Sequence, residues 1–172
     1  SIVVATGKAR FGIRRNGFNV FDSIWLDDGS GEYPVRLLRA HERGIVMYAG
    51  GQEYVSADDP ASTVEVESAG PMRVVVRAEG RLEPFGGDTR FYYVCRLYFF
   101  NGSPVVRMAL SIENRGDFVP GIEDKVDMTG LQVELPFDGA PSGAYAGMPG
   151  LDGSEPRAFD DSAAVEAPSV DV

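Results

Sequence analysis

The sequence predicts an all-β protein, an antiparallel β-sandwich, on two observations. Apolar and polar residues alternate with period two in many short segments, and Gly, Pro, Asn and Asp separate these segments. Such alternation is typical of strands that bury one face, and many short strands bounded by turns are typical of a sandwich or barrel. In addition, no segment of helix length shows an apolar period of 3.6 residues with caps.

The first quarter of the chain predicts a series of antiparallel strands joined by turns. Thr6-Gly7 separates the first two strands, and Asn16-Gly17 predicts a tight hairpin into the third. In that third strand we expect Phe18, Val20, Asp22 and Ile24 on one side and Phe21 and Trp25 on the other. The candidate strands of this part span residues 1–5, 8–15, 18–26 and 33–39, with a polar turn at 27–32 before the last.

The other strands predicted outside residues 64–114 are shorter or lie nearer the C-terminus. A strand begins at residues 45–47 and ends at Gly50-Gly51, and residues 58–60 form a turn. Residues 128–137 alternate again, with Leu131, Val133 and Leu135 predicted to face inward. Gly, Pro, Ala and Asp dominate residues 138–172, a loop-rich tail in which 163–172 are expected to hold one or two edge strands.

Residues 64–114 form the centre of the prediction, because three period-two segments are separated there by two turn signals. Residues 101–104, Asn-Gly-Ser-Pro, close a hairpin between the second and third segments. The predicted inward sets are Met72, Val74, Val76 and Ala78; Phe91, Tyr93, Cys95, Leu97 and Phe99; and Val106, Met108, Leu110 and Ile112.

The same hairpin predicts the register of the central sheet. Tyr98 then faces Arg107, Arg96 faces Ala109 and Val94 faces Ser111, which keeps the apolar sets on one side. The opposite side gathers arginines and tyrosines. A guanidinium binds a carboxylate through a planar fork, and a tyrosine offers a flat surface with a polar tip, so this side suits an acidic sugar. The predicted substrate-binding residues are Arg73, Arg77, Arg96, Arg107, Tyr92 and Tyr98.

An alternative interpretation of the same side remains open. Charged residues are expected on the outer face of a sandwich sheet in any case. The arginines would then be paired with nearby Glu and Asp side chains, and the face would pack against a second sheet edge or a neighbouring domain.

Length and charge limit the partners. The chain has 172 residues and a formal net charge of −10. Its size allows one sandwich domain over 1–172, and a start at Ser1 favours an excerpt of a longer multidomain chain. Nucleic-acid binding requires Lys and Arg to neutralise phosphates, so no nucleic-acid partner is predicted. No apolar run approaches the roughly 20 residues of a membrane span.

Few residues are candidates for catalysis. His41 and Cys95 are the only histidine and cysteine, which excludes a multi-histidine metal site within the chain. We expect His41 in a solvated loop or at a strand end, and Cys95 as a small buried apolar side chain. No catalytic residue is assigned.

Acidic pairs are the only candidates for metal binding. They lie at 27–28 with Glu32, at 58–59 and at 160–161. Calcium favours several oxygen ligands on a turn, but turn carboxylates more often hydrogen-bond their own backbone. No metal site or cofactor is therefore assigned, and calcium stays an open alternative.

Several stretches together resemble a known family. TGKARFGI, then GFNVFDSIWLD, then VEVESAGPMRVVVRAEG and FYYVCRLYFFNGSPVVRM occur in this order. They resemble the central β-sandwich region of the exo-rhamnogalacturonan lyase-like (YetA-like) polysaccharide lyases, over about residues 2–137. A His-Thr pair expected after the Ser-Pro turn is replaced by residues 108–111, Met-Ala-Leu-Ser, so no catalytic residue is carried over.

The resemblance implies a supersandwich-like module of an extracellular or periplasmic carbohydrate-active protein. The family's chemistry is expected to need a helical domain, so the module would help bind an acidic polysaccharide beside neighbouring domains of a longer chain. Whether the chain takes part in an enzyme is left open. The alternative function is a non-catalytic carbohydrate-binding or structural module of an extracellular or filamentous assembly.

Overall fold

The computed structural model describes residues 1–38, 41–84, 90–116, 126–138, 144–146 and 157–159. Among them no α-helix occurs, and one 3₁₀ turn, η1 (Ser56–Asp58), is present. The strands are β1 (Ile2–Ala5), β2 (Ala9–Ile13), β3 (Ser23–Leu26), β4 (Val35–Arg36), β5 (Ile45–Ala49), β6 (Gln52–Val55), β7 (Thr63–Ala69), β8 (Arg73–Arg81), β9 (Glu83–Pro84), β10 (Phe91–Phe100), β11 (Val106–Asn114), β12 (Met128–Val133), β13 (Ala144–Ala146) and β14 (Arg157–Phe159).

The chain divides into two compact units, residues 1–138 and residues 139–172. The first holds three antiparallel four-stranded sheets, in the orders β1-β2-β3-β4, β11-β10-β8-β7 and β12-β5-β6-β9. In the second, β13 pairs antiparallel with β14. The residues at 163–172, for which the sequence predicts edge strands, lie outside the described part of the chain. The predicted fold class, an all-β antiparallel sandwich, is confirmed.

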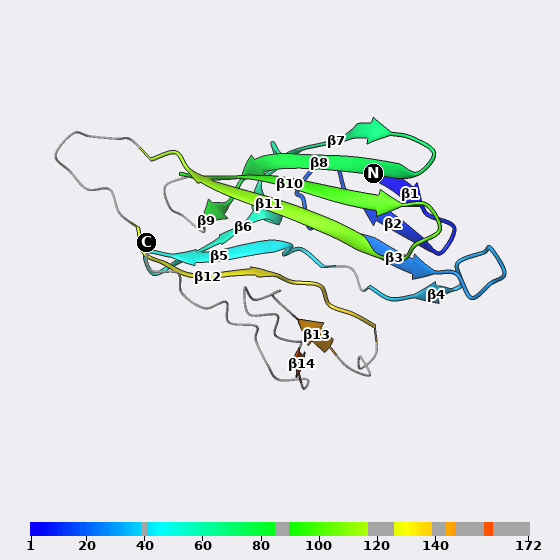
Figure 1. The fold of residues 1–172 in the computed structure, drawn as a ribbon. Helices are drawn as coiled ribbons and strands as arrows, with labels where there is room; N and C mark the ends of the chain where they lie inside the picture. Colours follow the sequence, from blue (N-terminus) through cyan, green and yellow to red (C-terminus); the bar gives the residue numbers. More distant parts are fainter. Residues whose placement is uncertain (39–40, 85–89, 117–125, 139–143, 147–156, 160–172) are drawn as a thin grey trace, which may run out of the picture. The chain divides into compact units, whose positions relative to one another are not determined.

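The long sheet β11-β10-β8-β7 forms one layer of the first unit, and the other two sheets form the second layer (Figure 1). The aromatic core shows how they meet. At one end of β10, the ring centroid of Phe99 lies 5.1 Å from that of Phe11 in β2. At the other end, Phe91 lies 4.9 Å from Tyr54 in β6. The buried face of β10 therefore packs against both smaller sheets.

The central hairpin follows the predicted register. Tyr98 pairs with Arg107, Arg96 with Ala109 and Val94 with Ser111. On β10 the burial alternates residue by residue, as the period-two pattern predicts. Two members of the predicted inward sets are nevertheless exposed: Met72 precedes β8 and is 71 % exposed, and Met108 is 38 % exposed.

The third predicted strand is wrong over its first half. β3 begins only at Ser23, so β2 and β3 pair without a tight turn at Asn16-Gly17. The side chains of Phe18, Val20 and Phe21 are all buried, which period-two alternation does not allow. Val20 has a φ of 69°, and the Phe21 N–H donates to the Asn19 carbonyl. The chain turns inward here and fills the core with consecutive side chains.

The strands at the periphery differ from the prediction in extent. β4 covers only Val35–Arg36 of the expected 33–39. The strand predicted to begin at residues 45–47 and end at Gly50-Gly51 is confirmed as β5, and the two glycines, both with positive φ, turn it directly into β6. Among the residues predicted to face inward in residues 128–137, Leu131 of β12 is 41 % exposed, whereas Val133 and Leu135 pack against the core. Among the described residues no helix is long and apolar enough to cross a membrane.

Candidate functional site

The predicted arginines and tyrosines lie on the outward face of the β11-β10-β8-β7 sheet. The sheet register sets them there, because Arg77 pairs with Arg96, and Arg107 pairs with Tyr98. Their neighbours in each strand, such as Phe99 and Val76, are buried in the core. We call this the Arg/Tyr face; it comprises Arg73, Arg77, Arg96, Arg107, Tyr92 and Tyr98.

Two of these arginines are paired with carboxylates. The Arg96 guanidinium forms a two-pronged contact with Glu67, with N···O distances of 2.8–3.0 Å. Arg77 donates to Glu79 and lies 3.8 Å from Glu65. The Arg96 hydrogen bonds lower the pKa of the Glu67 carboxyl, and Glu67 raises the pKa of Arg96. Hence the charges of Arg77 and Arg96 are largely neutralised within the protein, as the alternative interpretation expects.

The other two arginines flank one tyrosine ring. The Arg73 guanidinium carbon lies 5.8 Å from the ring centroid of Tyr98, and that of Arg107 lies 5.7 Å from it. Among the described residues no carboxylate pairs with either arginine. We call these residues the Arg73–Tyr98–Arg107 cluster. It presents two positive charges on an aromatic ring at the outside of the sheet.

Tyr92 lies at the far end of the same strand. Tyr98 lies six positions further along β10, which corresponds to roughly 20 Å along a strand. The guanidinium of Arg115 lies 4.1 Å from the Tyr92 ring and is itself paired with Glu113 at 2.7 Å. The structure therefore separates Tyr92 from the Arg73–Tyr98–Arg107 cluster, although both lie on the predicted face.

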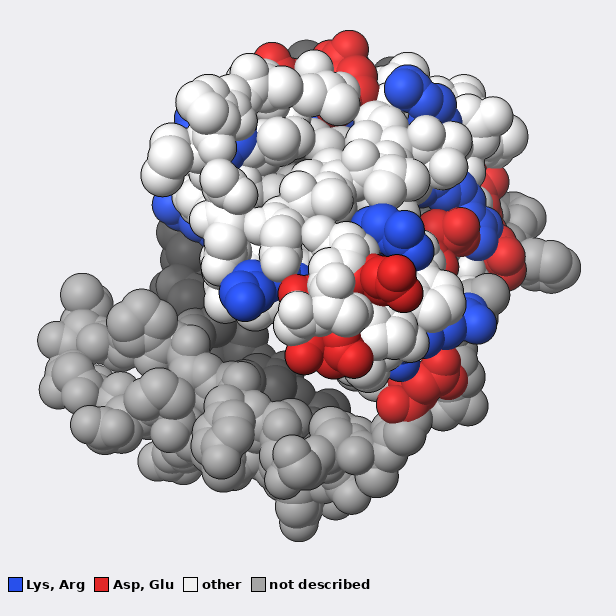
Figure 2. All heavy atoms as spheres, turned by 90° about the vertical axis from the view of Figure 1, so that its right-hand side faces the viewer, with Lys and Arg blue, Asp and Glu red and all other residues white. Residues whose placement is uncertain are grey.

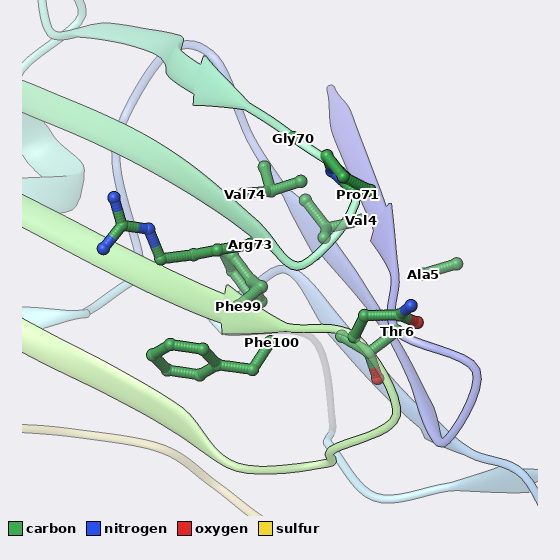
Figure 3. Close-up of a pocket in the computed structure, with 10 residues that line it drawn as sticks. Val4, Ala5, Thr6, Gly70, Pro71, Arg73, Val74, Phe99 and Phe100 are labelled. Carbon is green, nitrogen blue, oxygen red and sulfur yellow. The ribbon is translucent and has the colours of Figure 1, made fainter.

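A small open pocket of about 160 Å³ lies beside the cluster, where three turns meet. The Asn101 N–H donates to the Met72 carbonyl at 3.0 Å, and the Gly102 N–H donates to the Thr6 carbonyl at 2.7 Å. These bonds join the turns that follow β1, β7 and β10. Arg73 and Phe100, which pair across β8 and β10, extend in the same direction from the pocket wall (Figure 3). Sequence reasoning missed Phe100, which is 38 % exposed next to Arg73.

The charged side chains at this end of the molecule are mixed in sign. Figure 2 looks from the side on which Figure 1 shows the β10–β11 turn, and there Lys and Arg lie among Asp and Glu beside a broad uncharged area. Local pairing, rather than a continuous basic surface, decides which cations are available to a ligand.

His41 and Cys95, the two side chains considered for catalysis, are hydrogen-bonded and buried, respectively. The His41 ring nitrogen Nε2 lies 3.0 Å from the Phe21 carbonyl, which can only accept, so Nε2 carries the proton. Cys95 is fully buried as predicted, and burial raises the pKa of its thiol to about 12.

The acidic turns mainly bind their own backbone. Asp27 Oδ1 accepts from the Gly31 N–H at 2.7 Å, and Asp28 Oδ1 accepts from the Ser30 N–H at 3.0 Å. The buried Asp59 accepts from the Ala61 and Arg81 N–H groups at 2.8 and 2.7 Å. No group of three or more candidate metal ligands occurs in the described ranges, and Asp160 and Asp161 lie outside them.

Comparison with known families decides the relationship. The model of the PcRGLX-like protein central beta sandwich domain matches residues 1–144. The chain belongs to this family. The resemblance to rhamnogalacturonan lyase-like proteins is thereby confirmed, and the match covers β1 to β12 and the start of β13. No curated protein and no solved structure matched the chain.

Proposed function

We propose that this β-sandwich contributes to the binding of an acidic polysaccharide and does not carry a catalytic centre. The observation behind the proposal is the Arg73–Tyr98–Arg107 cluster. Its two arginines flank the Tyr98 ring on the outward face of the sheet, and among the described residues neither has a carboxylate partner. Its place would be an extracellular or periplasmic lyase-like protein, where neighbouring domains of the longer chain supply the chemistry.

Uronate chemistry matches this arrangement. A guanidinium donates two parallel hydrogen bonds to a carboxylate, and bonds to a charged group contribute about 1.5–3 kcal/mol. The tyrosine ring offers a flat apolar surface and its hydroxyl offers a polar tip to a sugar. Arg77 and Arg96 are less available, because a ligand carboxylate would have to displace Glu79 or Glu67.

A pair of matched double variants tests the proposal. R73Q/R107Q removes the two available charges, whereas R77Q/R96Q removes two charges that are already paired. We expect the first to weaken binding of a rhamnogalacturonan oligosaccharide at least about tenfold, because each lost charged hydrogen bond is worth more than the ~1.4 kcal/mol that a tenfold change requires. The second should change the dissociation constant little. Isothermal titration calorimetry on both variants measures this.

A carboxyl-reduced oligosaccharide of the same length is the ligand control, since it keeps the sugar rings and lacks the negative charges. It should bind wild type no better than the acidic form binds R73Q/R107Q. An unchanged dissociation constant together with an unchanged number of bound oligosaccharides in R73Q/R107Q would overturn the proposal.

A structural role in an assembly is the second candidate. Residues 128–137 expose apolar side chains, with Met128 59 %, Leu131 41 % and Phe137 42 % exposed, which suits contact with another domain or chain. Sedimentation velocity over a range of concentrations tests the version in which chains associate. A monomer at every concentration would remove that version.

A further inference from the structure

A second row of arginines and aromatic rings lies on the outward face of the β1-β2-β3-β4 sheet. Arg10 of β2 pairs with Trp25 of β3, and Trp25 pairs with Arg36 of β4. The Arg10 guanidinium carbon lies 6.0 Å from the Trp25 ring centroid, and that of Arg36 lies 5.8 Å from it. We call these residues, together with Tyr33, the Arg/Trp row. It repeats the arrangement of the Arg73–Tyr98–Arg107 cluster on a different sheet.

Tyr33 extends the row from the loop between β3 and β4. The Arg10 guanidinium carbon lies 5.5 Å from the Tyr33 ring centroid, so this cation sits close to two rings. Tyr33 has a φ of 55°, a left-handed backbone that residues with bulky side chains seldom adopt. The Asp27 carboxylate caps the Gly31 N–H and so holds the loop in place. The loop thus keeps an aromatic ring beside Arg10 at the cost of an unfavourable backbone conformation.

The charge of Arg10 is available to a ligand. Within the part of the chain that the structure describes, no carboxylate pairs with Arg10, although Asp27 and Asp28 lie in the adjoining loop. Those two carboxylates accept from backbone N–H groups instead. Arg36 is more constrained, since it donates to the Leu38 carbonyl at 2.9 Å and lies 3.8 Å from Asp138.

The two arginine-bearing faces point in opposite directions. On β2, Phe11 faces inward and contacts Phe99 on the inward face of β10. Arg10 precedes Phe11 and Tyr98 precedes Phe99, so each points away from the shared core. One short oligosaccharide therefore cannot contact both faces at once.

We propose that the Arg/Trp row is a second binding face for the same class of ligand, a uronate-containing glycan. Arg10 pairs with a carboxylate, Arg36 supports it, and Trp25 and Tyr33 contact sugar rings. The inference rests on the proposed function for its ligand class. It adds that the module is bivalent, so that a long polymer or two neighbouring polymers can engage both faces and gain avidity.

Tryptophan fluorescence tests the inference directly, because Trp25 is the only tryptophan of the chain. Its emission reports the Arg/Trp row alone. We expect a saturable change in wild-type emission on titration with a rhamnogalacturonan oligosaccharide, and two sites by calorimetry. R10Q/R36Q should weaken the fluorescence-detected affinity about tenfold while the Arg73 site keeps its calorimetric affinity. R10Q alone provides a second variant, because Arg36 also holds the backbone near Leu38.

The variant R73Q/R107Q separates the two proposals. It should retain the Trp25 response and lose one calorimetric site. An emission change in wild type that persists unaltered in R10Q, or no emission change at saturation of the Arg73 site, would overturn the second face. If instead Trp25 responds and R73Q/R107Q binds two equivalents with unchanged affinity, the second face stands and the proposed function of the first face fails.

Discussion

At the scale of single residues, Gly80 leaves no room for a side chain. A Cβ at this position would lie 2.7 Å from Asp59 Oδ2 and 3.0 Å from the Tyr93 hydroxyl oxygen. Asp59 is buried and accepts the Arg81 N–H through that same oxygen at 2.7 Å. Gly80→Ala should therefore lower the free energy of unfolding by about 1–3 kcal/mol, the usual cost of overpacking a core.

Urea unfolding measures that change. Gly70→Ala is the matched control, because its Cβ would meet only the Arg73 carbonyl at 3.7 Å. Equal urea midpoints for Gly80→Ala and wild type would contradict the close packing of Asp59 and Tyr93 against Gly80.

Because the Cys95 thiol is buried, we expect the protein to lose stability in alkaline solution. Burial disfavours the thiolate and raises the pKa of the thiol from 9.0 to about 12. Between these values the unfolded chain releases a proton that the folded chain keeps, so the free energy of unfolding falls as pH rises through this window. One such group contributes up to about 1.4 kcal/mol per pH unit there.

Urea unfolding at a series of pH values above 9 measures this slope, and Cys95→Ala should show a shallower one by up to one proton. Tyr93 contributes in the same direction in both proteins, because burial raises the pKa of its hydroxyl. Identical slopes for wild type and Cys95→Ala would show that the thiol is not shielded.

At the scale of strands, β10 carries adjacent phenylalanines with opposite roles. Phe99 is 1 % exposed and contacts the rings of Phe11 and Phe21, whereas its neighbour Phe100 is 38 % exposed on the Arg/Tyr face. Phe99→Ala should cost about 3–5 kcal/mol of stability, which is a large part of the roughly 5–15 kcal/mol of a typical domain.

Phe100→Ala is the control on the same strand and should shift the thermal midpoint only slightly. Differential scanning calorimetry of both variants measures the difference. Comparable losses in the two variants would contradict the assignment of buried and exposed faces on β10.

The sequence predicts the register of this sheet well, because period-two burial and the Asn-Gly-Ser-Pro turn together allow only one alignment of Tyr98 with Arg107. It does not predict which arginines are paired. The β7–β8 register shifts between Val66 and Ser68, and Glu67 lies at this irregularity, where its carboxylate binds Arg96. Such a shift depends on tertiary packing and leaves no periodic pattern in the sequence.

The conformation of the Phe18–Phe21 segment is also predicted wrongly from the sequence. Its apolar residues fit an alternating strand, yet all of them fill the core from an irregular turn with Val20 at φ 69°. The Arg/Trp row was also not predicted, because Arg10, Trp25 and Arg36 come together only through the pairing of β2, β3 and β4. The periodic pattern predicts the fold class and one face of one sheet, whereas which arginines are free of carboxylate partners depends on tertiary contacts.

At the scale of the whole molecule, we expect the chain to bind glycan without turnover. The family match covers residues 1–144, and the described side chains most suited to acid–base or nucleophilic chemistry, His41 and Cys95, are engaged or buried. Incubation of the chain with rhamnogalacturonan should yield no unsaturated sugar, the product of elimination across a uronate, by ultraviolet absorbance. Product formation at enzyme-like rates would contradict a non-catalytic module.

Backbone amide and arginine side-chain NMR, recorded during titration with a rhamnogalacturonan oligosaccharide, shows which arginines of the Arg/Tyr face bind the glycan. We expect saturable shifts for Arg73, Tyr98 and Arg107, with Arg77 and Arg96 little changed because Glu79 and Glu67 already hold them. The carboxyl-reduced oligosaccharide should cause much smaller shifts. Shifts confined to Arg77 and Arg96, or none at Arg73 and Arg107 at saturation, would contradict the claim that unpaired arginines around Tyr98 bind the glycan.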